Sequence, residues 1–85
     1  MAEQVTYYAI VDDYSSRAQP AGVLRRIKHE GGQRDEAFGR DLTWGHTSIL
    51  YSYERGNRDN ELFPIGEEEA MRIVDRIRRE VSMPD

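Results

Sequence analysis

The feature that most restricts the fold is an amphipathic segment near the C-terminal end of the chain, residues 66–81. Its apolar residues follow one another at spacings that place them on one stripe of an α-helix. These residues are Ala70, Ile73, Val74, Ile77 and Val81. Acidic residues fill the first turn and arginines the last turns, where the helix dipole favours them. A helix with one apolar stripe must bury it, so the preceding residues have to supply the opposing surface.

The first half of the chain is predicted to supply this surface as strands, two of them joined by a hairpin. Residues 5–11, VTYYAIV, are β-branched and aromatic, and both alternating faces are largely apolar, so we expect a central strand. Residues 22–30 predict a second strand, which carries more charge and should lie nearer an edge. The Gly31-Gly32 pair predicts a tight hairpin. It leads into a weaker third strand at residues 34–41, for which a helix is the alternative.

Two further strands are predicted before the helix. In residues 48–55, SILYSYER, alternating side chains share a face, which predicts a fourth strand. Residues 61–65, ELFPI, predict a short last strand, and Pro64 places it at an edge because proline cannot donate to a β-ladder. We therefore predict an α+β fold: an antiparallel sheet of four to five strands with one C-terminal helix packed on one face, in the order β-β-β-β-β-α. Residues 1–85 should form a single domain.

The composition excludes several classes of function. Twelve basic and sixteen acidic residues are interspersed along the chain, for a net charge of −4. Because clustered Lys and Arg drive most nucleic-acid affinity, this pattern disfavours a nucleic-acid binder. The chain has no cysteine, which rules out disulfides, thiolate nucleophiles and cysteine zinc sites. No apolar run approaches the ~20 residues that span a bilayer, and the first residues lack a signal-peptide pattern, so we expect a cytoplasmic protein with no membrane partner.

The polar residues of the sequence form no recognisable catalytic or metal-binding pattern. The two histidines, His29 and His46, lie far apart and have no metal-type spacing to each other or to carboxylates. A Ser–His–acid set could be assembled from Ser15, Ser16, His46 and Asp41, but no nucleophile elbow or glycine-rich oxyanion motif accompanies them. We therefore predict no catalytic, cofactor-binding or metal-binding residues and no cofactor, and we favour a non-enzymatic protein.

The connection formed by residues 12–22, DDYSSRAQPAG, is long for a loop between adjacent strands, where 2–5 residues are usual. Ser15, Ser16 and Arg17 are residue types that bind anions. The segment nevertheless lacks the glycines and the following helix start that a phosphate-binding loop uses. We expect a turn-rich loop whose hydroxyls bond to its own backbone and whose Arg17 is available to a partner. Anion binding by this loop is kept as an alternative.

Tyr, Trp and Arg are concentrated on or beside the predicted strands, and these residue types are enriched at interface hot spots. The alternative is that the tyrosines simply line the core beneath the helix. We predict a protein-interaction or regulatory accessory module that binds a protein partner or a second copy of itself. The contact would use the uncovered sheet face, an edge strand or the 12–22 loop. The predicted partner-binding residues are Arg17, Arg25, Trp44 and Tyr53.

Two other functions are kept as alternatives. A small acidic immunity-type or inhibitor protein would direct its carboxylates at a basic target, and its association would depend strongly on salt. A small-molecule or anion-binding domain, or a small enzyme, would need a pocket joining the 12–22 loop to Trp44 and His46.

Three stretches, YYAIVDDYSSRAQPAGVLRR, RDEAFGRDLTW and GEEEAMRIVDRI, give the chain its overall pattern. In this pattern it resembles small uncharacterised proteins of actinobacteria over nearly its whole length. Eleven of the twelve basic residues are arginine, which agrees with a GC-rich bacterial genome. The resemblance implies a compact intracellular domain and assigns no functional residues.

Overall fold

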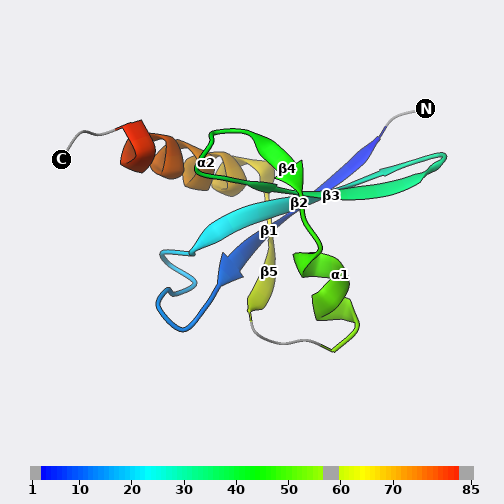
Figure 1. The fold of residues 1–85 in the computed structure, drawn as a ribbon, viewed down its shortest axis with the longest axis horizontal. Helices are drawn as coiled ribbons and strands as arrows, with labels where there is room; N and C mark the ends of the chain where they lie inside the picture. The colour runs from blue at the N-terminus through cyan, green and yellow to red at the C-terminus, as the bar shows by residue number, and fades with distance from the viewer. Residues whose placement is uncertain (1–2, 57–59, 83–85) are drawn as a thin grey trace.

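The computed structural model describes residues 3–56 and 60–82. These residues form a five-stranded antiparallel sheet in the order β4-β3-β2-β1-β5 and two helices (Figure 1). In chain order the elements are β1 (Gln4–Val11), β2 (Gly22–His29), β3 (Gly32–Phe38), β4 (Trp44–His46), α1 (Ile49–Glu54), β5 (Glu61–Ile65) and α2 (Glu67–Ser82). The predicted α+β arrangement, an antiparallel sheet with a C-terminal helix, is confirmed.

Helix α2 covers one face of the sheet with the stripe that the sequence predicts (Figure 1). Strand alternation sends Val23 of β2 to this face, together with Tyr7 and Ala9 of β1. The buried cluster consists of Tyr7, Ala9, Val23, Phe38, Ala70, Ile73, Val74 and Ile77. Fully burying one large aliphatic side chain contributes about 1.5–3 kcal/mol, so this cluster is the main source of stability on the α2 side.

The opposite face of the sheet carries a second, smaller cluster. Leu24, next to Val23 in β2, points the other way and is fully buried. It packs with Leu62 of β5 and with Leu50 of α1. The face that a single helix would leave uncovered is therefore partly covered by α1.

The prediction of a strand at residues 48–55 is wrong, because this segment forms helix α1. Ile49, Leu50 and Tyr53 pack on the second cluster, a spacing that fits a helix, whereas Tyr51 is exposed. The Thr47 side-chain oxygen accepts a hydrogen bond from the Ile49 N–H at 3.2 Å and satisfies one free donor of the first turn. A six-residue helix is marginal by itself. The burial of Leu50 against the sheet therefore decides its conformation.

The fourth strand lies instead at Trp44–His46, within the segment that we expected to be a connection. The third strand occupies Gly32–Phe38 in place of residues 34–41. The tight hairpin is confirmed, since His29 pairs with Gly32 across a two-residue turn. Gly32 has a φ of 143°, a conformation that glycine tolerates best.

The expected edge position of the second strand is also wrong, because β2 lies between β1 and β3 in the middle of the sheet. Its arginines meet opposite charges on β3: Arg25 is in register with Glu36, and Arg26 with Asp35. Cross-strand ion pairs of this kind allow a charged strand to occupy an interior position. Strand β1 is interior as predicted, and β5 forms an edge.

Among the described residues, neither helix combines the length and the hydropathy required to cross a bilayer.

Candidate functional site

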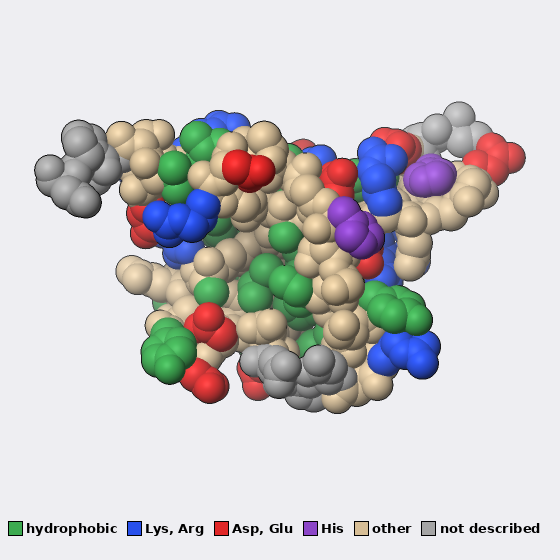
Figure 2. All heavy atoms as spheres, viewed as in Figure 1, with side chains coloured by type: hydrophobic (Ala, Val, Ile, Leu, Met, Phe, Trp, Pro, Cys, Tyr) green, Lys and Arg blue, Asp and Glu red, His purple; other side chains and the backbone are tan. Residues whose placement is uncertain are grey.

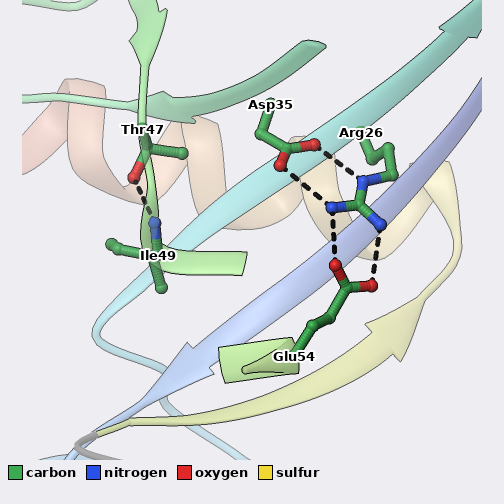
Figure 3. A network of polar contacts seen from close by, with 5 residues as sticks. All are labelled: Arg26, Asp35, Thr47, Ile49 and Glu54. Carbon is green, nitrogen blue, oxygen red and sulfur yellow. Dashed lines mark hydrogen bonds and ion pairs between the residues drawn. The ribbon is translucent and has the colours of Figure 1, made fainter. Parts of the chain in front are cut away.

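A buried arginine connects β2, β3 and α1 (Figure 3). The Arg26 side chain donates from Nε to Asp35 Oδ1 at 2.8 Å and from Nη2 to Asp35 Oδ2 at 3.1 Å. It also donates from Nη1 and Nη2 to Glu54 Oε2 and Oε1, at 2.8 and 3.0 Å. Arg26 and Asp35 are each only 8% exposed. Such burial is tolerable because each ion is paired and hydrogen-bonded.

The electrostatics of this network follow from its hydrogen bonds. Those from Arg26 to Asp35 and Glu54 raise the pKa of Arg26 further above its ordinary value. The hydrogen bond from Arg26 is also the largest cause of a lowered pKa at Glu54. Arg26 and Glu54 therefore remain charged across the physiological range, and their contact holds α1 against the sheet.

Strand β4 pairs with only part of β3. The pairing runs from Glu36 to Phe38, after which the Thr47 N–H donates to the Asp35 carbonyl at 3.1 Å and the chain turns into α1. The Asp35 carbonyl therefore faces away from β2. In an antiparallel strand, backbone groups two residues apart point the same way, so the N–H and C=O of Gln33 also face away from β2. In the part of the chain that the structure describes, residues 32–34 thus present a free strand edge beyond the end of β4.

A groove of about 490 Å³ lies beside this edge, and we call it the β3 groove. Its lining includes Arg26, Gln33, Arg34, His46, Thr47 and Tyr51. Figure 2 shows this side of the molecule, with histidine and basic side chains near the sheet margin and an exposed hydrophobic side chain lower down, in the region of α1. The groove thus combines backbone hydrogen-bonding groups with an aromatic ring and cationic side chains.

Tyr51 is the most prominent aromatic side chain of the groove and is 55% exposed. Arg55, one helical turn further on, holds its orientation. The Arg55 guanidinium carbon lies 5.3 Å from the centre of the Tyr51 ring, and its Nη1 donates to the Tyr51 hydroxyl at 3.1 Å. An exposed aromatic ring ordered in this way loses less side-chain entropy when a partner covers it.

Two of the predicted contact residues, Arg25 and Trp44, lie together on the α2 side of the sheet. The Arg25 guanidinium carbon is 4.1 Å from the centre of the Trp44 ring. Arg25 also donates to Glu36 Oε1 from Nε at 2.9 Å and from Nη2 at 2.7 Å. Glu36 is in register with both Arg25 and His46, so this pair adjoins the β3 groove across the end of β4.

The other two predicted contact residues lie elsewhere. Arg17 forms an ion pair with Glu69 of α2 at 2.7 Å, and its guanidinium carbon lies 5.4 Å from the centre of the Phe63 ring. Tyr53 packs against the second apolar cluster on the opposite face from α2. The four predicted residues therefore do not form one continuous surface.

The connection between β1 and β2 is turn-rich, as predicted, and its hydroxyls bond within the loop. Asp12 Oδ1 accepts from the Tyr14 N–H at 2.9 Å and from the Ser15 hydroxyl at 3.0 Å. The Ser16 side-chain oxygen accepts from the Gln19 N–H at 3.1 Å. Ser15 thus donates its hydroxyl hydrogen within the loop, whereas the bond at Ser16 uses its oxygen as an acceptor.

Sequence reasoning missed the residues at the centre of this site, including Arg26 and Asp35. A signal for this pair was present, because a tight hairpin at Gly31 sets the cross-strand register and with it the pairing of the two residues. No comparable local signal pointed to Glu54, which reaches the pair only because α1 folds back on the sheet.

The chain matches no protein-family model, and no curated protein or solved structure shows significant similarity to it.

Proposed function

We propose that this protein is an interaction module that accepts an extended segment of a partner protein as an added strand on the free edge of β3. The observation that carries the proposal is the outward-facing backbone of Gln33 beside the β3 groove. In strand addition, backbone hydrogen bonds supply much of the affinity, and adjacent pockets select side chains. Residues 32–34 and the groove supply these two elements next to each other.

The opposite edge of the sheet is less suited to this mode of binding. Strand β5 carries Pro64, which is in register with Tyr8 of β1. Proline has no N–H and occurs in sheets mainly where the missing donor faces outward, so its presence blunts the β5 edge. The free part of β3 contains no proline.

The side chains of the β3 groove favour a partner segment that carries both an aromatic or aliphatic residue and an acidic residue. Tyr51 offers an exposed ring, and tyrosine is enriched at interface hot spots. The Arg34 side chain is 51% exposed, and its own ion pair with Glu36 is long, at 3.6 Å. The carboxylate of Asp35 is satisfied by Arg26, so it leaves Arg34 available to attract an acidic side chain.

The predicted contacts at Arg25 and Trp44 extend this proposal. Because β4 occupies β3 from Glu36 to Phe38, a partner that also contacts the Arg25–Trp44 pair would have to leave the edge of β3 and pass over β4. Contacts at Arg17 and Tyr53 would require a separate surface of the partner.

The proposal is tested by selecting random peptides against the full chain and measuring the affinity of the selected peptides by calorimetry. Gln33→Pro removes the outward N–H without removing a donor to β2, and Tyr51→Ala removes the ring. Each variant should weaken binding about tenfold or more. Tyr14→Ala is a matched control, because Tyr14 is 98% exposed and lies in the 12–22 connection.

Amide chemical shifts on peptide binding should change at Gln33 and Asp35 and across β4. Failure to select any peptide that saturates would contradict the proposal, as would binding that survives both Gln33→Pro and Tyr51→Ala. Light scattering over a range of concentrations tests the case in which the partner is a second copy. A constant monomer mass would exclude self-association, while peptide binding would be unaffected.

A further inference from the structure

A second hollow, of about 290 Å³, lies between α2 and the connection that precedes β2. Its polar lining comprises Arg72, Arg76 and Arg79 of α2, Gln19 of the connection and Glu69. We call it the α2 hollow. In Figure 2 basic side chains lie between α2 and this connection. The hollow is separate from the β3 groove and shares no residue with it.

The three arginines converge because of their spacing on the helix. Residues separated by four and then three positions lie on one face of an α-helix, so Arg72, Arg76 and Arg79 form a row. That row runs beside the apolar stripe, and Ile73 of the stripe also lines the hollow. The facing wall is fixed in place: Pro20 is buried, and its carbonyl accepts a hydrogen bond from Arg76 Nη2.

The positive charge in the hollow is poorly compensated. Arg72 pairs with Glu68 at 3.9 Å, and both side chains are largely exposed, so this pair contributes little. Arg76 lies 3.9 Å from Glu80, and its buried Nε forms no hydrogen bond among the described residues. Within the described part of the chain, Arg79 has no ion pair within 4.0 Å.

Glu69 contributes a carboxylate to the lining, and this carboxylate already forms an ion pair. Arg17, which is outside the lining, holds it at 2.7 Å. Glu68 lies beside Arg72 with a largely exposed side chain, and Asp12 and Glu80 border a neighbouring hollow that Arg76 also lines. An anion would therefore meet positive charge on the side of Arg72 and Arg79 and repulsion on the side of Asp12.

We propose that the α2 hollow binds a small anion that carries phosphate groups and is about the size of pyrophosphate. Guanidinium groups bind phosphate oxygens bidentately, and several guanidinium groups in a row suit a chain of phosphates better than a single carboxylate. The amide of Gln19 adds a neutral donor. The site is unexpected in a chain with a net charge of −4, and it uses arginines of α2 in place of the serines of the connection.

The test is a titration of the full chain with pyrophosphate, inorganic phosphate and ATP, each at constant ionic strength, followed by calorimetry and by NMR. Saturable binding should shift the signals of Gln19 and of Arg72, Arg76 and Arg79. Tighter binding of pyrophosphate than of phosphate would show that the anion contacts several arginines of the row at once. Equal affinity for ATP and pyrophosphate would show that only the phosphates are recognised, whereas tighter binding of ATP would assign a nucleotide as the ligand.

The informative variant is the double substitution Arg72→Gln with Arg79→Gln, because both side chains are exposed and the fold should tolerate their loss. It should weaken pyrophosphate binding about tenfold or more. Arg78→Gln is the matched control, since Arg78 lies on the same helix, pairs with Asp75 and contacts the Phe38 ring outside the hollow. Absence of saturable binding would overturn the proposal, and so would an equal loss in Arg78→Gln and in the double variant.

Discussion

Arg26 and Glu54, 28 residues apart in the chain, form a two-point contact that fastens α1 to the sheet. The same guanidinium group holds the buried carboxylate of Asp35, its neighbour across the β2–β3 hairpin. Arg26 thus satisfies two charges from two different elements (Figure 3). The position of α1, and with it the wall of the β3 groove that carries Tyr51, depends on this side chain.

Replacing Arg26 with leucine should lower the free energy of unfolding by about 3–5 kcal/mol, because the Asp35 carboxylate would remain buried without a counter-charge. The double variant Arg26→Leu with Asp35→Leu removes both buried charges and should recover part of that loss. Urea denaturation of the two variants measures the difference. A double variant less stable than Arg26→Leu would show that packing at the site, and not the unpaired charge, causes the loss.

The ion pair between Arg26 and Glu54 predicts that the free energy of unfolding depends on pH. The pKa of Glu54 is lower in the folded protein than its ordinary value of 4.5, chiefly because of the hydrogen bond from Arg26. The folded state therefore favours the ionised carboxylate, and the stabilisation is present above pH 4.5 and lost as the pH falls through the folded pKa. Because Glu54 is half exposed, the effect should stay within about 1 kcal/mol.

The measurement is the difference in unfolding free energy between the natural protein and Glu54→Gln at pH 7 and at pH 3. This difference should shrink at the lower pH. Glu30→Gln, an exposed position in the hairpin turn, serves as the control. A difference that stays constant between the two pH values would contradict the assigned ionisation.

Leu50 and Tyr51 give a direct test of the helical conformation of α1. Leu50 is 3% exposed and packs on Leu24 and Leu62, so Leu50→Ala should cost about 2–5 kcal/mol. Tyr51→Ala should change the stability by no more than about 0.5 kcal/mol, because the ring is exposed. A strand at this place with Tyr51 on its inward face would reverse the order of these two effects. Thermal or urea unfolding of the two variants decides between them.

Arg25 and Trp44 provide a spectroscopic prediction. Trp44 is the only tryptophan, and it is half-buried between the Arg25 guanidinium and the rings of Tyr7 and Phe38. Replacing Arg25 with glutamine should expose one face of the indole, shift its emission to longer wavelength and increase quenching by acrylamide. The lost cation–π contact should cost about 0.5–2 kcal/mol. Unchanged emission would mean that Arg25 does not cover the ring in solution.

Local patterns in the sequence were enough to predict α2, β1 and the β2–β3 hairpin. The apolar stripe of α2 needs only a helical period. Strand β1 follows from its β-branched and aromatic residues, and the hairpin follows from Gly31 and Gly32. In each case neighbouring residues carry the information, so the conformation can be predicted without knowing what packs against it.

The conformation of the short apolar segments and the position of the charged strand depend on long-range packing, which local patterns do not show. The SILYSYER segment is short enough to suit a strand or a helix, and the contact of Leu50 with Leu24 and Leu62 selects the helix. The charge on β2 suggested an edge, but Glu36 and Asp35 neutralise it inside the sheet. The β3 groove and the α2 hollow likewise combine residues far apart in the chain. Their formation depends on long-range contacts, whose energies no local pattern in the sequence encodes.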